Sequence, residues 1–157
     1  MGDKVLVTGG AGFMGSALVR VLADEGYKVF SYDNFATGTA SNLKGVIPAD
    51  NVIRGDVEGW KFARTLSAIE PEIVYHLAAD PYIPLSYDHP ERFVRTNFQG
   101  TLNVLMTCKT FEVKRIIHYS TSEVYGSAKA VPMNEAHPTA PQSVYAVSKL
   151  AADHLCQ

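Results

Sequence analysis

Residues 5–15 read VLVTGGAGFMG: an apolar run, a glycine-rich turn and the start of a helical pattern that continues with apolar residues at 17, 18, 21 and 22. The apolar run predicts a buried strand, and the spacing after it predicts a helix. A helix that begins at such a turn directs its free N–H groups and its positive dipole end at whatever lies on the turn. Glycines at 9, 12 and 15 allow the backbone to approach a pyrophosphate and allow helix and strand to pack closely.

An acidic residue stands where the second predicted strand ends. Residues 28–32, KVFSY, form that strand, and Asp33 follows it, about 20 residues beyond the glycine turn. A carboxylate at this place accepts hydrogen bonds from the adenosine ribose hydroxyls and disfavours a 2′-phosphate. The pattern therefore predicts NAD rather than NADP as the ligand. The alternative is an acid in a solvated loop.

Strands and helices alternate along the rest of the chain. The further expected strands are residues 51–56, 72–79 and 115–119, and the expected helices are residues 58–70, 90–112 and a stretch that starts at 143. A loop with three prolines, at 81, 84 and 90, is expected after the fourth strand, and a short helix near Asn42. The alternation predicts an α/β, Rossmann-like, doubly wound parallel sheet with helices on both faces. Its ligand crevice should lie at the carboxyl ends of the strands.

Composition limits the classes of protein that remain. A chain of 157 residues that is 46% hydrophobic can bury one core, so a single domain over residues 1–157 is expected. A formal net charge of −2 argues against a nucleic-acid or membrane-surface role. No run approaches the length of a membrane span, and no metal site is predicted. Cys108 and Cys156 lie in predicted helices without a partner motif, which favours free thiols in a reducing cytoplasm.

The residues that could take part in catalysis come after the fifth predicted strand. Tyr145 and Lys149 are four residues apart on the last helix, hence on one face. A lysine ammonium beside a phenol lowers the pKa of the tyrosine toward a useful value for a base. Ser120 and Thr121 follow the strand and can hold a substrate alcohol near Tyr145, and Glu123 adds a carboxylate. Taken singly, the two hydroxyls are equally explained by turn chemistry and Glu123 by a solvated loop.

Taken in order, these motifs resemble the extended short-chain dehydrogenase/reductases that act on nucleotide sugars. The resemblance covers residues 4–157. It is carried by the glycine turn, Asp33–Asn34, GDV at 55–57, HLAA at 76–79, TN at 96–97 with GT at 100–101, STSEVYG at 120–126, and Tyr145 with Lys149.

The resemblance implies an NAD site and assigns residues to its parts. Gly9, Gly12, Phe13 and Met14 would bind the pyrophosphate, Asp33 and Asn34 the adenosine ribose, and Asp56 and Val57 would meet the adenine; Leu77, Ala78, Ala79 and Ser120 would line the cofactor cleft. Asn97 would be a buried structural and catalytic amide.

The resemblance also implies catalytic roles. Tyr145 would contact the cofactor and take the proton of the sugar hydroxyl while hydride passes to NAD, and Lys149 would hold the nicotinamide ribose. Thr121 would position the C4 hydroxyl of the sugar. Glu123 would remove the C5 proton after oxidation at C4, which favours a 4,6-dehydratase. The alternatives are a 4-epimerase, a UDP-glucuronate decarboxylase-type enzyme, or an NAD-binding module without turnover.

The family resemblance carries expectations about partners and extent. Relatives are roughly twice as long, so the chain corresponds to an N-terminal half that stops after the Tyr-x-x-x-Lys helix, without the C-terminal substrate domain. The expected partners are a UDP- or GDP-linked sugar and a second copy of the chain, which would form a homodimer through the helices at 90–112 and 143–157. No nucleic acid or membrane partner is expected, and the expected location is the cytoplasm.

Overall fold

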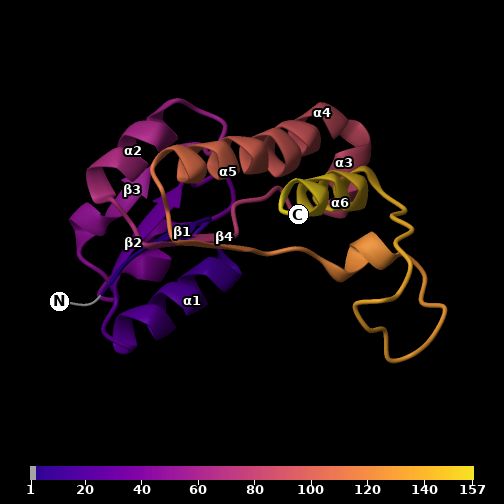
Figure 1. Cartoon of the computed structure of the whole chain (residues 1–157), viewed down its shortest axis with the longest axis horizontal. Helices are drawn as coiled ribbons and strands as arrows, with labels where there is room; N and C mark the ends of the chain where they lie inside the picture. Colours follow the sequence, from indigo (N-terminus) through magenta and orange to yellow (C-terminus); the bar gives the residue numbers. More distant parts are fainter. Residues whose placement is uncertain (1–2) are drawn as a thin grey trace.

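The computed structural model describes residues 3–157 and contains one five-stranded parallel sheet in the order β3-β2-β1-β4-β5 (Figure 1). The strands are β1 (Lys4–Thr8), β2 (Lys28–Asp33), β3 (Val52–Arg54), β4 (Ile73–His76) and β5 (Arg115–His118). The strand order reverses between β1 and β4, so a crevice opens at the carboxyl ends of these two strands. The predicted Rossmann-like parallel sheet is confirmed.

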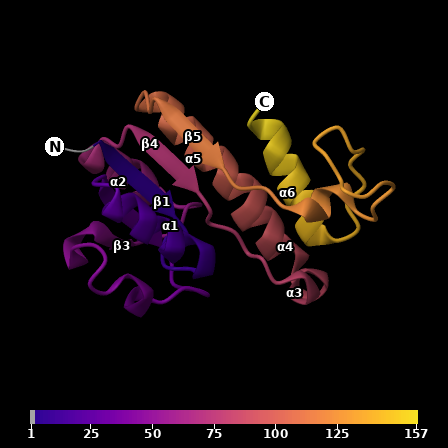
Figure 2. The same cartoon turned by 90° about the horizontal axis from the view of Figure 1, so that it is seen from below.

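Helices cover both faces of the sheet, as predicted (Figures 1 and 2). They are α1 (Phe13–Asp24), α2 (Lys61–Ile69), α3 (Ile83–Asp88), α4 (Pro90–Phe93), α5 (Gly100–Thr110) and α6 (Val144–Leu155). In Figure 1, α1 lies on one side of the sheet, and α2 and α5 lie on the other. Side chains of a strand alternate between faces, so Leu6 of β1 packs with the α2–α5 core while Val5 and Val7 pack with the α1 core.

Two predicted segments differ from the structure in kind. The helix expected over 90–112 is divided into α4, a π-helical segment η3 (Val94–Gln99) and α5. The proline-containing loop expected after β4 holds the short helix α3, because Pro84 lies in its first turn, where the missing N–H of proline costs nothing.

The other differences concern the ends of elements. α2 begins at Lys61 instead of residue 58, and β3 and β4 are shorter than the expected runs 51–56 and 72–79. The short helix expected near Asn42 is a 3-10 helix over Ala40–Leu43, and a second one precedes β3. The start of α6 is fixed by Ser143, whose Oγ accepts a hydrogen bond from the N–H of Ala146 at 3.0 Å.

Candidate functional site

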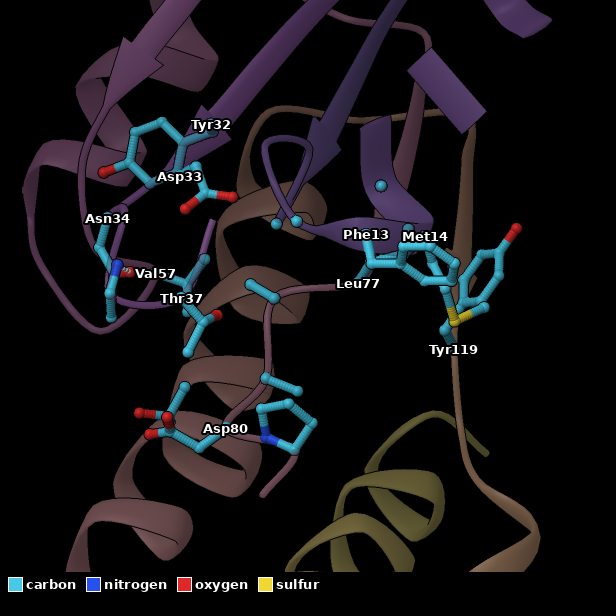
Figure 3. A pocket seen from close by; sticks show the side chains of 18 of the residues that line it. Phe13, Met14, Tyr32, Asp33, Asn34, Thr37, Val57, Leu77, Asp80 and Tyr119 are labelled. Atoms are coloured by element: carbon cyan, nitrogen blue, oxygen red, sulfur yellow. Dashed lines mark hydrogen bonds between the residues drawn. The ribbon is translucent and has the colours of Figure 1, made fainter. Parts of the chain in front are cut away.

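A cavity of about 390 Å³ lies at the carboxyl edge of the sheet, where the crevice is expected (Figure 3). Every residue assigned above to the cofactor lines it: Gly9, Gly12, Phe13, Met14, Asp33, Asn34, Asp56, Val57, Leu77, Ala78, Ala79, Ser120, Tyr145 and Lys149. In Figure 3, Tyr32, Asp33 and Asn34 gather at one end, and Phe13, Met14 and Tyr119 at the other. The fold thus brings residues that are more than one hundred positions apart into one site.

The glycine turn forms one wall of the cavity, and its backbone lies very close to neighbouring backbone atoms. Gly9 has φ +69°, and a Cβ there would lie 2.8 Å from the backbone N of Ala78. A Cβ on Gly15 would lie 2.1 Å from the carbonyl oxygen of Gly9, so only glycine fits at either position. α1 starts after Gly12 with no side-chain cap and no acidic residue in its first turn. The N–H groups at its start are left for an anion in the cavity.

Asp33 ties the glycine turn to the loop after β2. The N–H of Ala11 donates to Oδ2 of Asp33 at 3.0 Å, and the N–H of Phe35 donates to Oδ1 at 2.8 Å. Phe35 has φ +60°, so this hydrogen bond helps to hold a backbone conformation that a non-glycine residue rarely adopts. Each carboxylate oxygen keeps a second lone pair for a hydroxyl donor. The negative charge of Asp33 opposes a phosphate at the same place.

Next to Asp33, the polar end of the cavity is linked by hydrogen bonds. Nδ2 of Asn34 donates to Oδ2 of Asp56 at 3.0 Å, and the N–H of Glu58 donates to Oδ1 of Asp56 at 3.0 Å. The Tyr32 hydroxyl donates to the carbonyl oxygen of Asp56 at 3.2 Å. Burial, with the nearby Asp56 carboxylate, raises the pKa of Tyr32 to about 12. Tyr32 therefore stays a neutral donor at physiological pH.

Tyr145 and Lys149 reach the cavity from one face of α6, as their spacing predicts. Lys149 is buried; its Nζ donates to the carbonyl oxygen of Tyr119 at 2.6 Å and lies 3.4 Å from Nε2 of His118. Burial lowers the pKa of Lys149 to about 8, against the opposing effect of the Asp153 carboxylate. The ring of Tyr145 packs edge-on against that of Phe93, with centroids 6.5 Å apart. This contact restricts the orientation of the phenol.

Of the three residues after β5 that were expected at the site, the structure places only Ser120 at the cavity. Ser120 lines the cavity, and its Oγ donates to Oδ2 of Asp153 at 2.5 Å. Thr121 accepts a hydrogen bond from the N–H of Glu123 at 3.3 Å and so caps the 3-10 helix Ser122–Tyr125. Neither Thr121 nor Glu123 is among the residues that line the cavity, and Glu123 is exposed. Their catalytic roles stay predictions.

The cavity is also lined by residues that were not predicted from the sequence to belong to the site. Tyr32, Thr37, Asp80, Thr96 and Tyr119 line the cavity without having been predicted there. Asp80 follows the HLAA motif directly, and its position after a strand end was a usable signal. Its carboxylate accepts two hydrogen bonds from Arg92, at 2.6 and 2.8 Å, and its N–H donates to Oδ1 of Asn97 at 2.8 Å. Thr96 belongs to the TN motif at 96–97, but the π-helical conformation that places it at the cavity was not predicted.

A parallel sheet in this order, with a glycine turn and a Tyr–Lys helix at its carboxyl edge, defines a Rossmann-like domain of the extended short-chain dehydrogenase/reductase type. The chain belongs to the GDP-mannose 4,6-dehydratase family, whose family model matches residues 6–157.

Similar proteins carry out two different reactions. The chain is 33% identical over 153 residues to a UDP-glucose 4-epimerase of Mycolicibacterium smegmatis, covering 96% of this chain and 49% of the relative. It is 34% identical over 165 residues to a probable dTDP-glucose 4,6-dehydratase of Sinorhizobium fredii, covering 96% of this chain and 47% of the relative. The crystal structure of UDP-glucose 4-epimerase from Brucella ovis in complex with NAD superposes with a TM-score of 0.91 at 32% identity, over 98% of this chain and 46% of that one.

The chain spans about half the length of the curated relatives that it matches. None of the helices in residues 3–157 is long and apolar enough to cross a membrane. Cys108 is buried and Cys156 is exposed, and both are free thiols.

Proposed function

We propose that this chain is the NAD-binding half of an enzyme that modifies a nucleotide sugar through transient oxidation at C4. The observation that carries the proposal is the meeting, in one cavity, of an uncapped helix start at a glycine turn, the Asp33 carboxylate and the Tyr145–Lys149 pair. Structures similar to this one are complexes with NAD or with UDP-glucose, which supports both ligands. We further propose that the protein works in the cytoplasm, consistent with its free thiols.

Different residues of this chain would bind the cofactor and move the proton. The start of α1 would hold the pyrophosphate by backbone N–H groups, and Asp33 would accept hydrogen bonds from the adenosine ribose. Bound NAD supplies an acceptor for hydride. Tyr145 would take the proton of the sugar hydroxyl, since the adjacent Lys149 ammonium stabilises the phenolate. Leu77 and Ala78 add apolar surface to the wall of the cavity beside this chemistry.

Among the reactions open to such a site, we favour 4,6-dehydration. Oxidation at C4 acidifies the C5 proton, and Glu123 follows β5 closely enough in sequence to act on a sugar bound beyond the cavity. Glu123 is exposed, and dehydratases as well as epimerases are among the relatives. A 4-epimerase, a UDP-glucuronate decarboxylase-type reaction and an NAD-binding module without turnover remain the alternatives.

Substitution of Glu123 separates these reactions. Glu123→Gln removes only the charge and the proton-accepting oxygen. In a complete enzyme that contains this chain, we therefore expect formation of a 4-keto-6-deoxy sugar from UDP- or GDP-sugars to stop, while transient NADH still appears. The loss should be on the order of 10² to 10⁴-fold, the usual contribution of a general base. Glu135→Gln, an exposed acid in the following loop, is the matched control and should have no effect.

The readouts are product mass and deuterium entry from solvent at C5. Inversion at C4 without deuterium at C5 would refute dehydration and favour the epimerase. If a complete enzyme that contains this chain shows no turnover with any UDP- or GDP-sugar, the NAD-binding module without turnover is favoured.

We also propose a homodimer through the helices at 90–112 and 143–157. An apolar stripe recurs every four residues along the first of these helices, at Val94, Phe98, Leu102 and Met106. Three of its members are 40% exposed or more, and Val147 on α6 is 53% exposed. Exposed apolar surface gathered on one helix face is typical of an association surface.

Sedimentation of the chain at micromolar concentration tests this surface. We expect self-association of the unmodified chain and a shift toward monomer for Met106→Asp, because a carboxylate buried in the stripe would lose its hydration. Val21→Asp, an equally exposed apolar position on α1, should leave the association unchanged. A monomeric unmodified chain with cooperative unfolding in the absence of NAD would contradict the proposal.

A further inference from the structure

His76, at the end of β4, lies at the centre of a chain of buried polar side chains that the proposed chemistry does not use. Its side chain is 2% exposed. Nδ1 lies 2.7 Å from Oγ1 of Thr8, at the end of β1, and Nε2 lies 3.0 Å from Oγ1 of Thr101, on α5. Both threonines are almost completely buried. The imidazole therefore bridges the sheet and the helix layer above it.

The neighbouring hydrogen bonds fix where the imidazole proton lies. The Thr101 hydroxyl donates to the carbonyl oxygen of Asn97 at 2.6 Å, so its single proton is used and it must accept from Nε2–H of His76. The Thr8 oxygen accepts from the N–H of Ala78 at 3.3 Å, which leaves its own proton for Nδ1. Every group is then satisfied. The Nδ1–H tautomer would leave the Thr8 hydroxyl and the Asn97 carbonyl without these partners.

The neutral form of His76 is also the one that its surroundings favour. Burial, together with the nearby His118 and Lys149, holds the pKa of His76 well below its ordinary value. The ring of His118 on β5 lies 5.4 Å away, centroid to centroid, and Lys149 reaches the same region from α6. No carboxylate is among the hydrogen-bond partners of His76 within the described part of the chain.

The two ends of this series of hydrogen bonds reach different walls of the cavity. At one end, the Thr8 hydroxyl holds the N–H of Ala78, a cavity residue. At the other, Nδ2 of Asn97 donates to Oγ of Ser148 at 3.0 Å, and the Ser148 hydroxyl donates to the carbonyl oxygen of Tyr145 at 2.7 Å. The imidazole thus connects the cavity wall at Ala78, just after β4, with α6, the helix that carries Tyr145 and Lys149.

We propose that His76, as the neutral Nε2–H tautomer, is a positioning residue that sets the Tyr145–Lys149 helix against the cofactor wall of the cavity. It touches neither ligand and acts through Thr8 on one side and Thr101 with Asn97 on the other. The proposal deepens the proposed function and rests on it, because the distance being set matters only if a cofactor lies between these two walls.

Ring ¹⁵N NMR of the histidine-labelled chain tests the tautomer, with the signal of His76 assigned by comparison with His76→Gln. We expect a protonated Nε2, an unprotonated Nδ1 and no titration between pH 5 and 8. Thr101→Val removes the acceptor of Nε2–H and should move the proton toward Nδ1, whereas Thr8→Val should leave it on Nε2. A wild-type Nδ1–H tautomer, or titration in this range, would overturn the proposal.

Calorimetric titration with NAD tests the consequence. Thr101→Val should weaken NAD about tenfold, or ~1.4 kcal/mol, although Thr101 does not line the cavity. Thr101→Ser restores the hydroxyl and should restore both the affinity and the tautomer. Thr110→Val is the matched control, since the Thr110 hydroxyl donates to the carbonyl of Met106, four residues earlier on the same helix, and has no histidine partner.

The outcomes separate the inference from the proposed function. Wild-type affinity for NAD in Thr101→Val, with the folded state intact by circular dichroism, would overturn the positioning role and leave the proposed function standing. Failure of the unmodified chain to bind NAD would overturn both.

Discussion

In a complete enzyme that contains this chain, replacement of Tyr145 by phenylalanine is expected to abolish oxidation of the nucleotide sugar and to leave the affinity for NAD nearly intact. The substitution removes only the transferable proton and its oxygen, and the ring keeps its edge-on packing against Phe93. Loss of a positioned general base costs on the order of 10² to 10⁴-fold in rate. The measurement is single-turnover formation of NADH, with NAD affinity from calorimetry.

Lys149→Ala should reduce both quantities. Lys149 is buried, donates to the carbonyl oxygen of Tyr119 and lines the cavity. In its proposed role, its removal would take away both the cation that stabilises the Tyr145 phenolate and a contact to the nicotinamide ribose. Tyr82→Phe, an exposed tyrosine outside the cavity, is the control and should behave like the unmodified chain. Turnover near the normal rate in Tyr145→Phe would show that Tyr145 is not the base.

Asp33→Ala should weaken NAD by tenfold or more, ~1.4 kcal/mol or above, and weaken NADP much less. The reason is that the carboxylate is an acceptor for ribose hydroxyls and a repulsive neighbour for a 2′-phosphate. Parallel titrations with the two dinucleotides measure the difference directly.

The second role of Asp33 calls for a matched variant. Its carboxylate also accepts the N–H groups of Ala11 and Phe35, so its removal loosens the turn as well as the ribose contact. Asp33→Asn keeps the size and one acceptor oxygen but not the charge. It should therefore keep more of the turn and lose most of the discrimination against NADP. Equal weakening of both dinucleotides in both variants would mean that Asp33 only holds the turn.

The cofactor end of the site could be predicted because its signals are local. The glycine turn needs glycine wherever backbone meets backbone, as at Gly9 and Gly15, and Asp33 is the last residue of a strand. Tyr145 and Lys149 are four residues apart on a helix, so their common face follows from helix geometry. The position of the crevice at the carboxyl ends of the strands then follows from the parallel sheet that the alternation of strands and helices predicts.

The rest depends on long-range contacts that no local pattern encodes. The π-helical segment that presents Thr96 to the cavity and buries Asn97 has the same apolar spacing as an ordinary helix. The positions of Thr121 and Glu123 depend on how the segment after Gly126 folds back, for example through the N–H of Ala140 donating to the carbonyl of Val124 at 3.0 Å. The series of hydrogen bonds through His76 joins five separate elements, β1, β4, α5, the π-helical segment and α6, and became visible only in three dimensions.

Calorimetric titration of the unmodified chain with NAD and with NADP measures the binding on which the proposed function depends, because the cavity, the glycine turn and Asp33 all contribute to it. We expect a saturable 1:1 complex with NAD and a weaker one with NADP. Absence of NAD binding, or a preference for NADP of tenfold or more, about 1.4 kcal/mol, would contradict it.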